Sequence, residues 1–323
     1  MTKVVRTLVA LVATTLLAST AAAQGFPNKP IRFIVPYPPG GGTDIVARLI
    51  APKMAEKLGQ PVLIDNKPGA STIIGTEILA KSAPDGYTIA LLTDSHTINP
   101  FIFKQLPYDS HKDFRPVTQL VFVPLMLIAH PSLQAKTLQD IINSEKAKSG
   151  KLNYASIGSG SPHFLAMEWL KQLSGINATN IPYKGVAPAV SDVVGGQVDI
   201  MFTGMSSALP HVRAGKLVGV AVSSAKRQPS TPEIPSVAET PGLAEFDFMT
   251  WYGVFAPAGT PEDIVARLSA EIADALNQPD VKERLASLGV VGAPSKPDAF
   301  AKFMEVEAKK LERIVKLAGV KPE

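Results

Sequence analysis

The segment with the clearest chemical potential is a glycine-rich loop, PYPPGGGTD at residues 36–44, which follows a strand-like run and precedes a helical pattern. Glycines let the backbone approach a ligand closely, and the N–H groups at a helix start favour an anion. The same pattern also fits a tight loop whose helix is capped by Thr43. No Gly-Lys-Ser/Thr follows and the glycines do not fit Gly-x-Gly-x-x-Gly, so neither familiar type of nucleotide loop is indicated.

A second loop of similar design, GSGSPH at residues 158–163, also follows a strand-like run. Ser161 is placed to cap the next helix, with Pro162 as its first residue. Ser159, Ser161 and His163 then surround a helix N-terminus, where hydroxyl groups and an imidazole can meet an anion. The alternative for His163 is a solvated or core histidine.

Further polar groups follow other strand-like runs. In YKGVAP at residues 183–188, Pro188 is expected to start a short helix, and Lys184 could pair with an anion or face water. Asp199 could orient a ligand donor or fasten a neighbouring backbone N–H. Thr93 and Ser95 stand at the carboxyl end of a strand, which is where open α/β sheets bind ligands. Several strand ends and helix starts are therefore expected to meet in one crevice.

Alternating strands and helices must position these loops. Short runs rich in β-branched residues predict buried strands at 31–35, 62–64, 88–92, 152–156, 198–202 and 218–222. Helical patterns are predicted at 44–58, 164–173, after a capping hydroxyl at Thr260, and at 297–317. This alternation indicates an α/β fold with parallel sheets covered by helices.

Two stretches, 121–130 and 248–257, are predicted to connect two lobes. Residues 24–125 and 248–323 would then form lobe 1, and residues 126–247 would form lobe 2. The proline-rich stretch 228–241 is predicted to be an ordered surface loop.

The chain begins with an export signal of residues 1–23, because Lys3 and Arg6 precede an apolar run and Ala21-Ala22-Ala23 supplies small residues for cleavage near Ala23. The apolar run is too short to span a membrane. We therefore expect the protein in the periplasm. No cysteine occurs among the 323 residues, which excludes disulfides, thiol catalysis and thiolate metal sites. The formal net charge is +4, with no basic block that would indicate nucleic acid as a partner.

Patterns expected of an enzyme are mostly missing. Ser159 and Ser161 do not lie in Gly-x-Ser-x-Gly, and the five histidines show no close metal-binding pair. No cofactor, metal or catalytic residue is predicted. A secreted hydrolase that uses Ser159 or Ser161 with His163 stays open as the main alternative.

Motifs along the whole mature chain resemble the Bug family of extracytoplasmic solute receptors, which serve tripartite tricarboxylate transporters. The resemblance is carried by the export signal, the loop at 36–44, DGYT at 85–88, the loop at 158–163, PYKGVAPA at 182–189 and GQVD at 196–199. It implies a two-lobe, type II periplasmic binding fold with a ligand cleft between the lobes. The implied ligand is an amino acid, a di- or tricarboxylate or an aromatic acid, captured without catalysis by a monomer and delivered to the transporter's membrane components.

The resemblance also implies that the loop at 36–44 contacts the ligand and that the region from Ser159 to His163, with the helix start near Ala187, cradles a carboxylate. The predicted ligand-binding residues are Tyr37, Pro38, Gly40, Gly41, Asp44, Ser71, Thr93, Ser95, Ser159, Ser161, His163, Ala187 and Asp199. One departure concerns residues 71–74, where the family usually has glycine and asparagine after Pro-Gly-Ala and this chain has STII. Tyr37 and Ser71 are the candidates for selecting the far end of the ligand. A sensory role in a signalling system, which would need a separate partner, is the other alternative.

Overall fold

The computed structural model describes residues 25–158, 160–320 and 322. The predicted export signal at residues 1–23 and the predicted site residue Ser159 lie outside the described residues. Within the described part of the chain, no helix is both long and apolar enough to cross a lipid bilayer.

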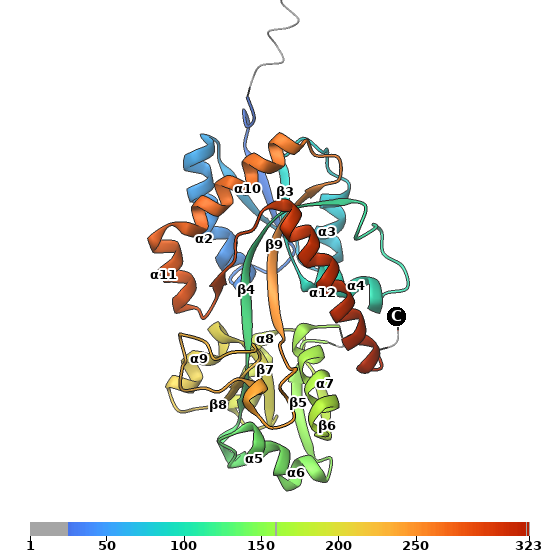
Figure 1. Cartoon of the computed structure of the whole chain (residues 1–323), viewed down its shortest axis with the longest axis vertical. Helices are drawn as coiled ribbons and strands as arrows, with labels where there is room; N and C mark the ends of the chain where they lie inside the picture. Colours follow the sequence, from blue (N-terminus) through green and yellow to red (C-terminus); the bar gives the residue numbers. More distant parts are fainter. Residues whose placement is uncertain (1–24, 159, 321, 323) are drawn as a thin grey trace, which may run out of the picture.

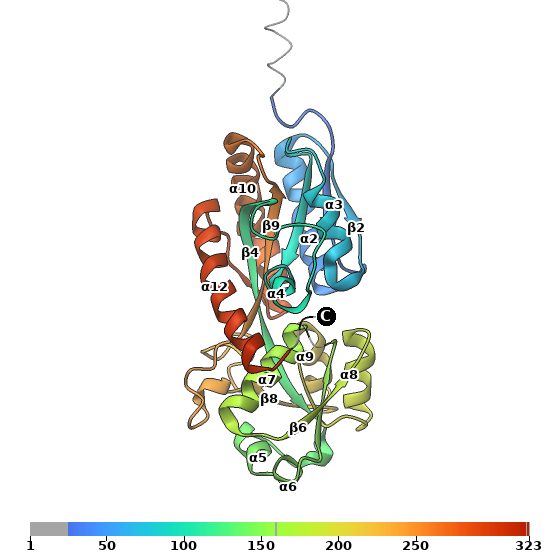
Figure 2. The same ribbon diagram turned by 90° about the vertical axis from the view of Figure 1, so that its right-hand side faces the viewer.

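Lobe 1 is a sheet with helices on both faces (Figures 1 and 2). Its strands run in the order β2-β1-β3-β9-β4, with β1 parallel to β2 and β3, and β9 antiparallel to β3 and β4. The strands are β1 (Ile31–Val35), β2 (Val62–Asn66), β3 (Thr88–Thr93), β9 (Met249–Pro257) and β4 (Phe114–Ala129), with the short β10 (Val291–Gly292) beside β4. The helices are α2 (Gly42–Leu58), α3 (Ile73–Ala80), α4 (Asp94–Ile102), α10 (Glu262–Asn277), α11 (Pro279–Ser287) and α12 (Pro297–Leu317), with a short turn η2 (Ala70–Thr72) before α3.

The two faces of the lobe 1 sheet follow from the alternation of side chains along its strands. Phe33 of β1 belongs to the core cluster that includes residues of α2, α10 and α11. The next residue, Ile34, belongs to a different cluster with residues of α3 and α12. The buried strand is therefore apolar on both sides, as is typical of a parallel sheet covered on both faces.

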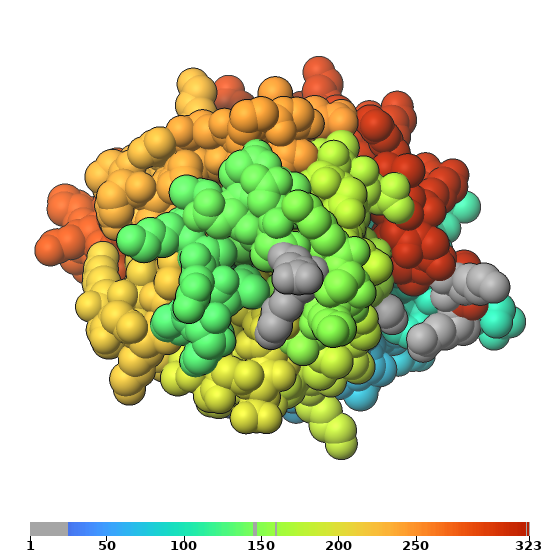
Figure 3. Space-filling model, turned by 90° about the horizontal axis from the view of Figure 1, so that it is seen from below, coloured from blue at the N-terminus to red at the C-terminus, as the bar shows by residue number. Residues whose placement is uncertain are grey.

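Lobe 2 repeats this plan with a smaller sheet. Its strands run in the order β6-β5-β7-β4, and β8 also pairs with β4. They are β5 (Leu152–Ser156), β6 (Ala178–Pro182), β7 (Ile200–Gly204) and β8 (Val218–Val222). The lobe's helices are α5 (Leu138–Asn143), α6 (Glu145–Lys148), α7 (Pro162–Ser174), α8 (Val186–Val194) and α9 (Met205–Arg213), with short turns η3 (Pro131–Leu133) and η4 (Val237–Glu239). Figure 3 shows the end of this lobe, where the α5 region (green) lies beside the connection from β8 to β9 (orange).

Two long strands, β4 and β9, join the lobes (Figure 1). Residues 114–124 of β4 pair with β9, and from Leu125 onward β4 pairs with β7 and β8 instead. The strand passes through Pro124 without ending, so the predicted crossing at 121–130 is the second half of a longer strand. The predicted crossing at 248–257 corresponds to β9.

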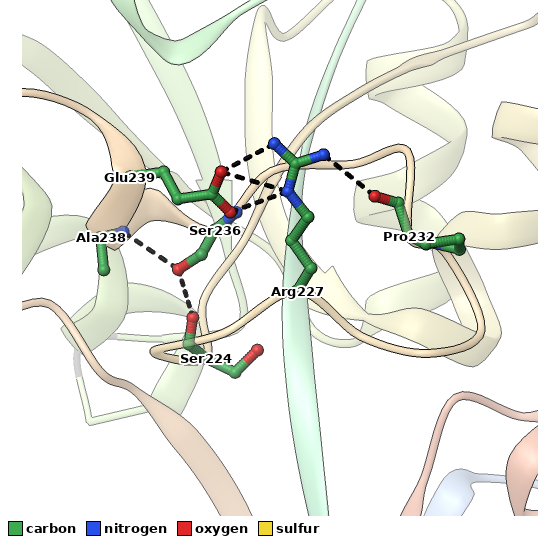
Figure 4. A network of polar contacts seen from close by, with 6 residues as sticks. All are labelled: Ser224, Arg227, Pro232, Ser236, Ala238 and Glu239. Carbon is green, nitrogen blue, oxygen red and sulfur yellow. Dashed lines mark hydrogen bonds and ion pairs between the residues drawn. The ribbon is translucent and has the colours of Figure 1, made fainter.

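The connection from β8 to β9 is an ordered surface loop, as predicted, and Figure 4 shows what holds it. The Arg227 guanidinium pairs with Glu239, with Nη2–Oε2 at 2.7 Å, and its Nη1 donates to the Pro232 carbonyl at 3.0 Å. The Ser236 hydroxyl donates to the Ser224 carbonyl at 2.5 Å and accepts from the Ala238 amide. Hydrogen bonding to Arg227 lowers the pKa of Glu239 to about 2, so this pair stays charged at neutral pH.

Several predicted element boundaries were wrong. Strand β7 begins at Ile200 rather than Val198, and α8 begins at Val186, two residues before Pro188. Helix α2 begins at Gly42 with no side-chain cap, so Thr43 does not cap it. Thr260 does not cap α10 either, because its hydroxyl donates to the Pro257 carbonyl at 2.7 Å.

Candidate functional site

A cavity of about 1210 Å³ lies between the lobes and is lined by residues of both. Lobe 1 contributes the loop from β1 to α2, the turn before α3, and the start of α4. Lobe 2 contributes the loops that lead into α7, α8 and α9. The lining includes ten of the predicted site residues, namely Tyr37, Pro38, Gly40, Gly41, Ser71, Thr93, Ser95, Ser161, His163 and Ala187. The predicted convergence of strand ends and helix starts is therefore present.

The loop from β1 to α2 is held by Asp44, which does not line the cavity. The Asp44 carboxylate accepts from the Gly40 amide, the Asn66 side-chain amide and the Arg48 guanidinium, each at 2.9 Å. Burial would raise the pKa of Asp44, but these three donors together lower it below its ordinary value. Asp44 was predicted to bind ligand; its side chain instead fixes the loop whose backbone faces the cavity.

A group of hydroxyls forms the lobe 1 wall. The Tyr37 hydroxyl lies 2.5 Å from Thr93 Oγ1 and donates to Ser95 Oγ at 3.4 Å. Thr93 also caps α4 by accepting from the Ser95 amide at 3.3 Å. Burial raises the pKa of Tyr37 to about 12, so its hydroxyl is neutral at any physiological pH. These three residues lie together and line the cavity, as the sequence predicted.

Among the lining residues of the same wall that the prediction missed are Tyr252 and Asp94. Tyr252 of β9 lines the cavity, and a Cβ on Gly42 would lie only 3.1 Å from its hydroxyl, so the glycine admits the ring. Asp94, the first residue of α4, also lines the cavity and is 2% exposed. The run Thr93-Asp94-Ser95 indicated a polar strand end, but only Thr93 and Ser95 were predicted to bind ligand.

On the lobe 2 wall, the start of α7 has the predicted form. Ser161 caps the helix by accepting from the Phe164 amide at 3.3 Å, and its hydroxyl donates to the Gly158 carbonyl at 2.7 Å. His163 lies in the first turn, and its Nδ1 is buried without a hydrogen-bond partner among the described residues. Burial lowers the pKa of His163 to about 4, so the imidazole is neutral near pH 7.

Two further helices begin at this wall. Gly185, Val186 and Ala187 line the cavity, and α8 has no side-chain cap at its N-terminus. Gly204 precedes α9, also without a side-chain cap, and Ser206 and Ser207 of its first turn line the cavity. First-turn N–H groups have no partner within their own helix, so the starts of α7, α8 and α9 supply donors to an anion. Ser206 and Ser207 lie in a polar run that the prediction did not use.

The remaining predicted residues take different positions. Asp199 does not line the cavity; its carboxylate accepts from the Asn153 amide at 3.0 Å, while the Asn153 side chain accepts from the Asp199 amide at 2.7 Å. It therefore fastens a neighbouring backbone, the second of its two predicted roles. Ser71 does line the cavity and has a left-handed backbone with φ of 51°. Its carbonyl accepts from the Asn99 side chain at 2.9 Å.

The arrangement does not assemble a hydrolase from the described residues. A serine nucleophile needs a base within hydrogen-bond reach of its hydroxyl. The Ser161 hydroxyl instead donates to a backbone carbonyl. Within the described ranges, no group of three His, Cys, Asp or Glu residues could hold a metal ion.

Comparisons of the sequence with known proteins identify a family of solute receptors. Residues 46–320 match the model of the tripartite tricarboxylate transporter family receptor. The chain belongs to this receptor family. Protein BugT of Bordetella pertussis is 35% identical over 99% of both chains, which identifies this family member as a Bug receptor. Its function at this level is solute binding.

Solved structures of other receptors share the two-lobe fold. Rpa4515 of R. palustris, solved with adipate, superposes with a TM-score of 0.85 at 31% identity, over 93% of this chain and 100% of that one. MatC of Rhodopseudomonas palustris, solved with bound malate, gives a TM-score of 0.79 at 35% identity, over 90% of this chain and 100% of that one.

Proposed function

We propose that this receptor captures a small carboxylated molecule in the cavity between its lobes and delivers it to the membrane components of a tripartite tricarboxylate transporter. The observation that carries the proposal is that α7, α8 and α9 all begin at one wall of the cavity. Helix starts favour anions through their N–H groups and their dipoles. Adipate and malate, the ligands of the two R. palustris receptors, are both carboxylates.

The described lining has few charged side chains that could bind an anion directly. Lys184 is the only lysine or arginine in this lining, and its side chain is exposed. A carboxylate held by backbone N–H groups and hydroxyls needs no arginine clamp. This arrangement supports capture of an anion such as a carboxylate by backbone N–H groups and hydroxyls.

We propose that capture proceeds by closure of the lobes about β4 and β9. Residues 24–125 and 248–323 would move as one lobe and residues 126–247 as the other. A ligand that contacts both walls binds the closed form better, so its differential affinity drives closure. We further propose that the protein acts as a monomer in the periplasm after cleavage near Ala23.

A thermal-shift screen of the protein without residues 1–23 tests this function. Ligands that bind only the folded state raise the melting temperature. The panel contains amino acids, dicarboxylates, citrate, nicotinate, phthalates and benzoates. A shift confined to one class of acid is expected, and turnover of an ester or amide substrate would instead support the hydrolase.

The substitution Ser161→Ala tests the position of the carboxylate. We propose that the Ser161 hydroxyl turns from the Gly158 carbonyl to the carboxylate when ligand binds, so its loss should weaken binding of the ligand found in the screen by roughly 1–3 kcal/mol. Thr137→Ala is the matched control, since Thr137 caps α5 in the same lobe and does not line the cavity.

Both variants lose a helix cap, so calorimetry should show similar losses of stability of about 1 kcal/mol. Only Ser161→Ala should lose affinity. Equal affinity of the two variants would remove Ser161 from the site.

A further inference from the structure

Asp94 is a buried carboxylate on the lobe 1 wall of the cavity. It directly follows β3, lines the cavity and is 2% exposed. Its Oδ1 accepts from the Ser95 amide at 3.1 Å, but its Oδ2 has no hydrogen-bond partner among the described residues. Buried carboxylates are normally paired or fully hydrogen-bonded, because an unpaired buried charge costs several kcal/mol. Thr93 also hydrogen-bonds to this carboxyl group. One oxygen of this cavity-lining residue is therefore buried without a donor from the described part of the chain.

Among the described residues, no cationic side chain interacts directly with Asp94, whose charge is stabilised only by Thr93 and by the N–H groups at the start of α4. Tyr37 from the loop after β1 and Tyr252 from β9 are neutral phenols that interact with it electrostatically. From α12, Glu307 adds a second acid, and the Lys310 ammonium lies 3.3 Å from Glu307. Burial first, and then repulsion from Glu307, raise the pKa of Asp94 to about 7. At neutral pH the carboxylate is thus poised between its two protonation states, and a cation beside it would hold it ionised.

The two walls of the cavity have opposite preferences. The starts of α7, α8 and α9 suit an anion, whereas Asp94 suits a positively charged hydrogen-bond donor. A dicarboxylate that spans the cavity would bring its second negative charge toward Asp94, and like charges in a desolvated site repel strongly. A ligand with one carboxylate and one ammonium group would satisfy both walls.

We propose that Asp94 is a specificity-determining residue and that this receptor selects an aminocarboxylate, with the ligand's carboxylate at the lobe 2 helix starts and its ammonium group at Asp94. The inference rests on the proposed function and names its substrate class. It also assigns the far end of the ligand to Asp94, beside the predicted selectors Tyr37 and Ser71.

Matched pairs of compounds test the proposal by calorimetric titration. Two pairs add an amino group to a dicarboxylate: succinate with aspartate, and glutarate with glutamate. The third pair, glutarate with 4-aminobutanoate, replaces one carboxylate by an amino group. The proteins are the native chain, Asp94→Asn, and the control Asp274→Asn, which makes the same change at an exposed position of α10. In at least one pair, the amino compound should bind at least about tenfold more tightly than the matched dicarboxylate, both to the native protein and to Asp274→Asn. Asp94→Asn should lose that preference.

The pH dependence gives a second readout. The ammonium group of the ligand stays charged, so affinity for the amino compound should rise from about pH 5.5 to about pH 8.5 as Asp94 loses its proton. Asp94→Asn should lack this rise. Melting curves of the unliganded variants show that both are folded.

Two results would overturn the proposal while leaving carboxylate capture intact. One is tighter binding of dicarboxylates with affinity that falls as pH rises, since Asp94 would then act as a protonated donor to a second acid. The other is unchanged affinity for every compound in Asp94→Asn. Failure of all carboxylates, in this series and in the screen, to bind the native protein would contradict the proposed function and, with it, this inference.

Discussion

Asp44 and Asp94 are two buried aspartates of lobe 1 with opposite surroundings. Asp44 has three donors at 2.9 Å and lies behind the loop, whereas Asp94 Oδ2 has no partner among the described residues and lines the cavity. The sequence predicted the polar loops that contain them, but it selected Asp44, which does not line the cavity, and not Asp94, which does. Side-chain direction depended on Asn66, which is distant in sequence, and no local pattern carries that information.

Replacing Asp44 should destabilise the fold. In Asp44→Ala the Gly40 amide, the Asn66 amide and the Arg48 guanidinium all lose their acceptor, and we expect a loss of about 2–4 kcal/mol in the free energy of unfolding. Folding lowers the pKa of Asp44, so its ionised carboxylate stabilises the folded state at pH values above the unfolded pKa of 3.8. This stabilisation is lost as the pH falls below 3.8. Urea denaturation at pH 7 and pH 3 checks this, with Asp274→Ala as the control. An equal difference from the native chain at both pH values would be inconsistent with this role.

Replacing Asp94 should have the opposite effect on the unliganded protein. Folding raises the pKa of Asp94 from 3.8 to about 7, which corresponds to a penalty on the order of 4 kcal/mol at neutral pH. The penalty is absent below the unfolded value, grows as pH rises from about 4 to about 7, and is constant above the folded value. Asp94→Asn should therefore be more stable than the native chain at pH 8 and similar to it near pH 4. A native chain that is the more stable protein at pH 8 would show that Asp94 has a partner in solution.

At the scale of elements, boundaries with strong local signals were predicted well. Strands β5 and β8 and helix α12 have the predicted bounds, and Ser161 and Pro162 begin α7 as expected. The start of β7 was predicted two residues early, because Asp199 has the alternating apolar neighbours of a strand but exchanges hydrogen bonds with Asn153. Pro188 was taken as the first residue of α8, although proline fits anywhere in a first turn where its missing N–H is not needed.

The two ends of α2 provide a test of the glycine-rich loop. Gly40 before the helix and Gly59 after it have φ of 82° and 67°, and a Cβ on either would meet no atom within 4 Å. Alanine at each position should cost roughly 1–2 kcal/mol of stability through the left-handed backbone. Only Gly40→Ala should also weaken ligand binding several-fold, because only Gly40 lines the cavity. Calorimetry of both variants checks this, and equal loss of affinity would show that the loop acts through general stability.

At the scale of the whole molecule, the two-lobe plan was predicted correctly because two β-rich runs were interpreted as connections between lobes and the motifs resembled the Bug family. The role of α12 was not predicted. Leu311, Ile314 and Val315 near its end share a core cluster with Trp169 of α7, and Figure 2 shows the helix descending from lobe 1 toward α7. Its apolar face gave no indication of which lobe it would cover, since an amphipathic pattern fixes a face and not a partner. The boundary that we propose for lobe 1 therefore includes a helix that also packs on lobe 2.

The measurement that tests carboxylate capture most directly compares a bound acid with its amide. Once a ligand is found, its carboxylate is replaced by a carboxamide of nearly the same shape, and both compounds are titrated calorimetrically. Helix starts favour a negative charge, so the acid should bind at least about tenfold more tightly than the amide. An amide that binds as tightly as the acid would contradict the carboxylate site at α7, α8 and α9.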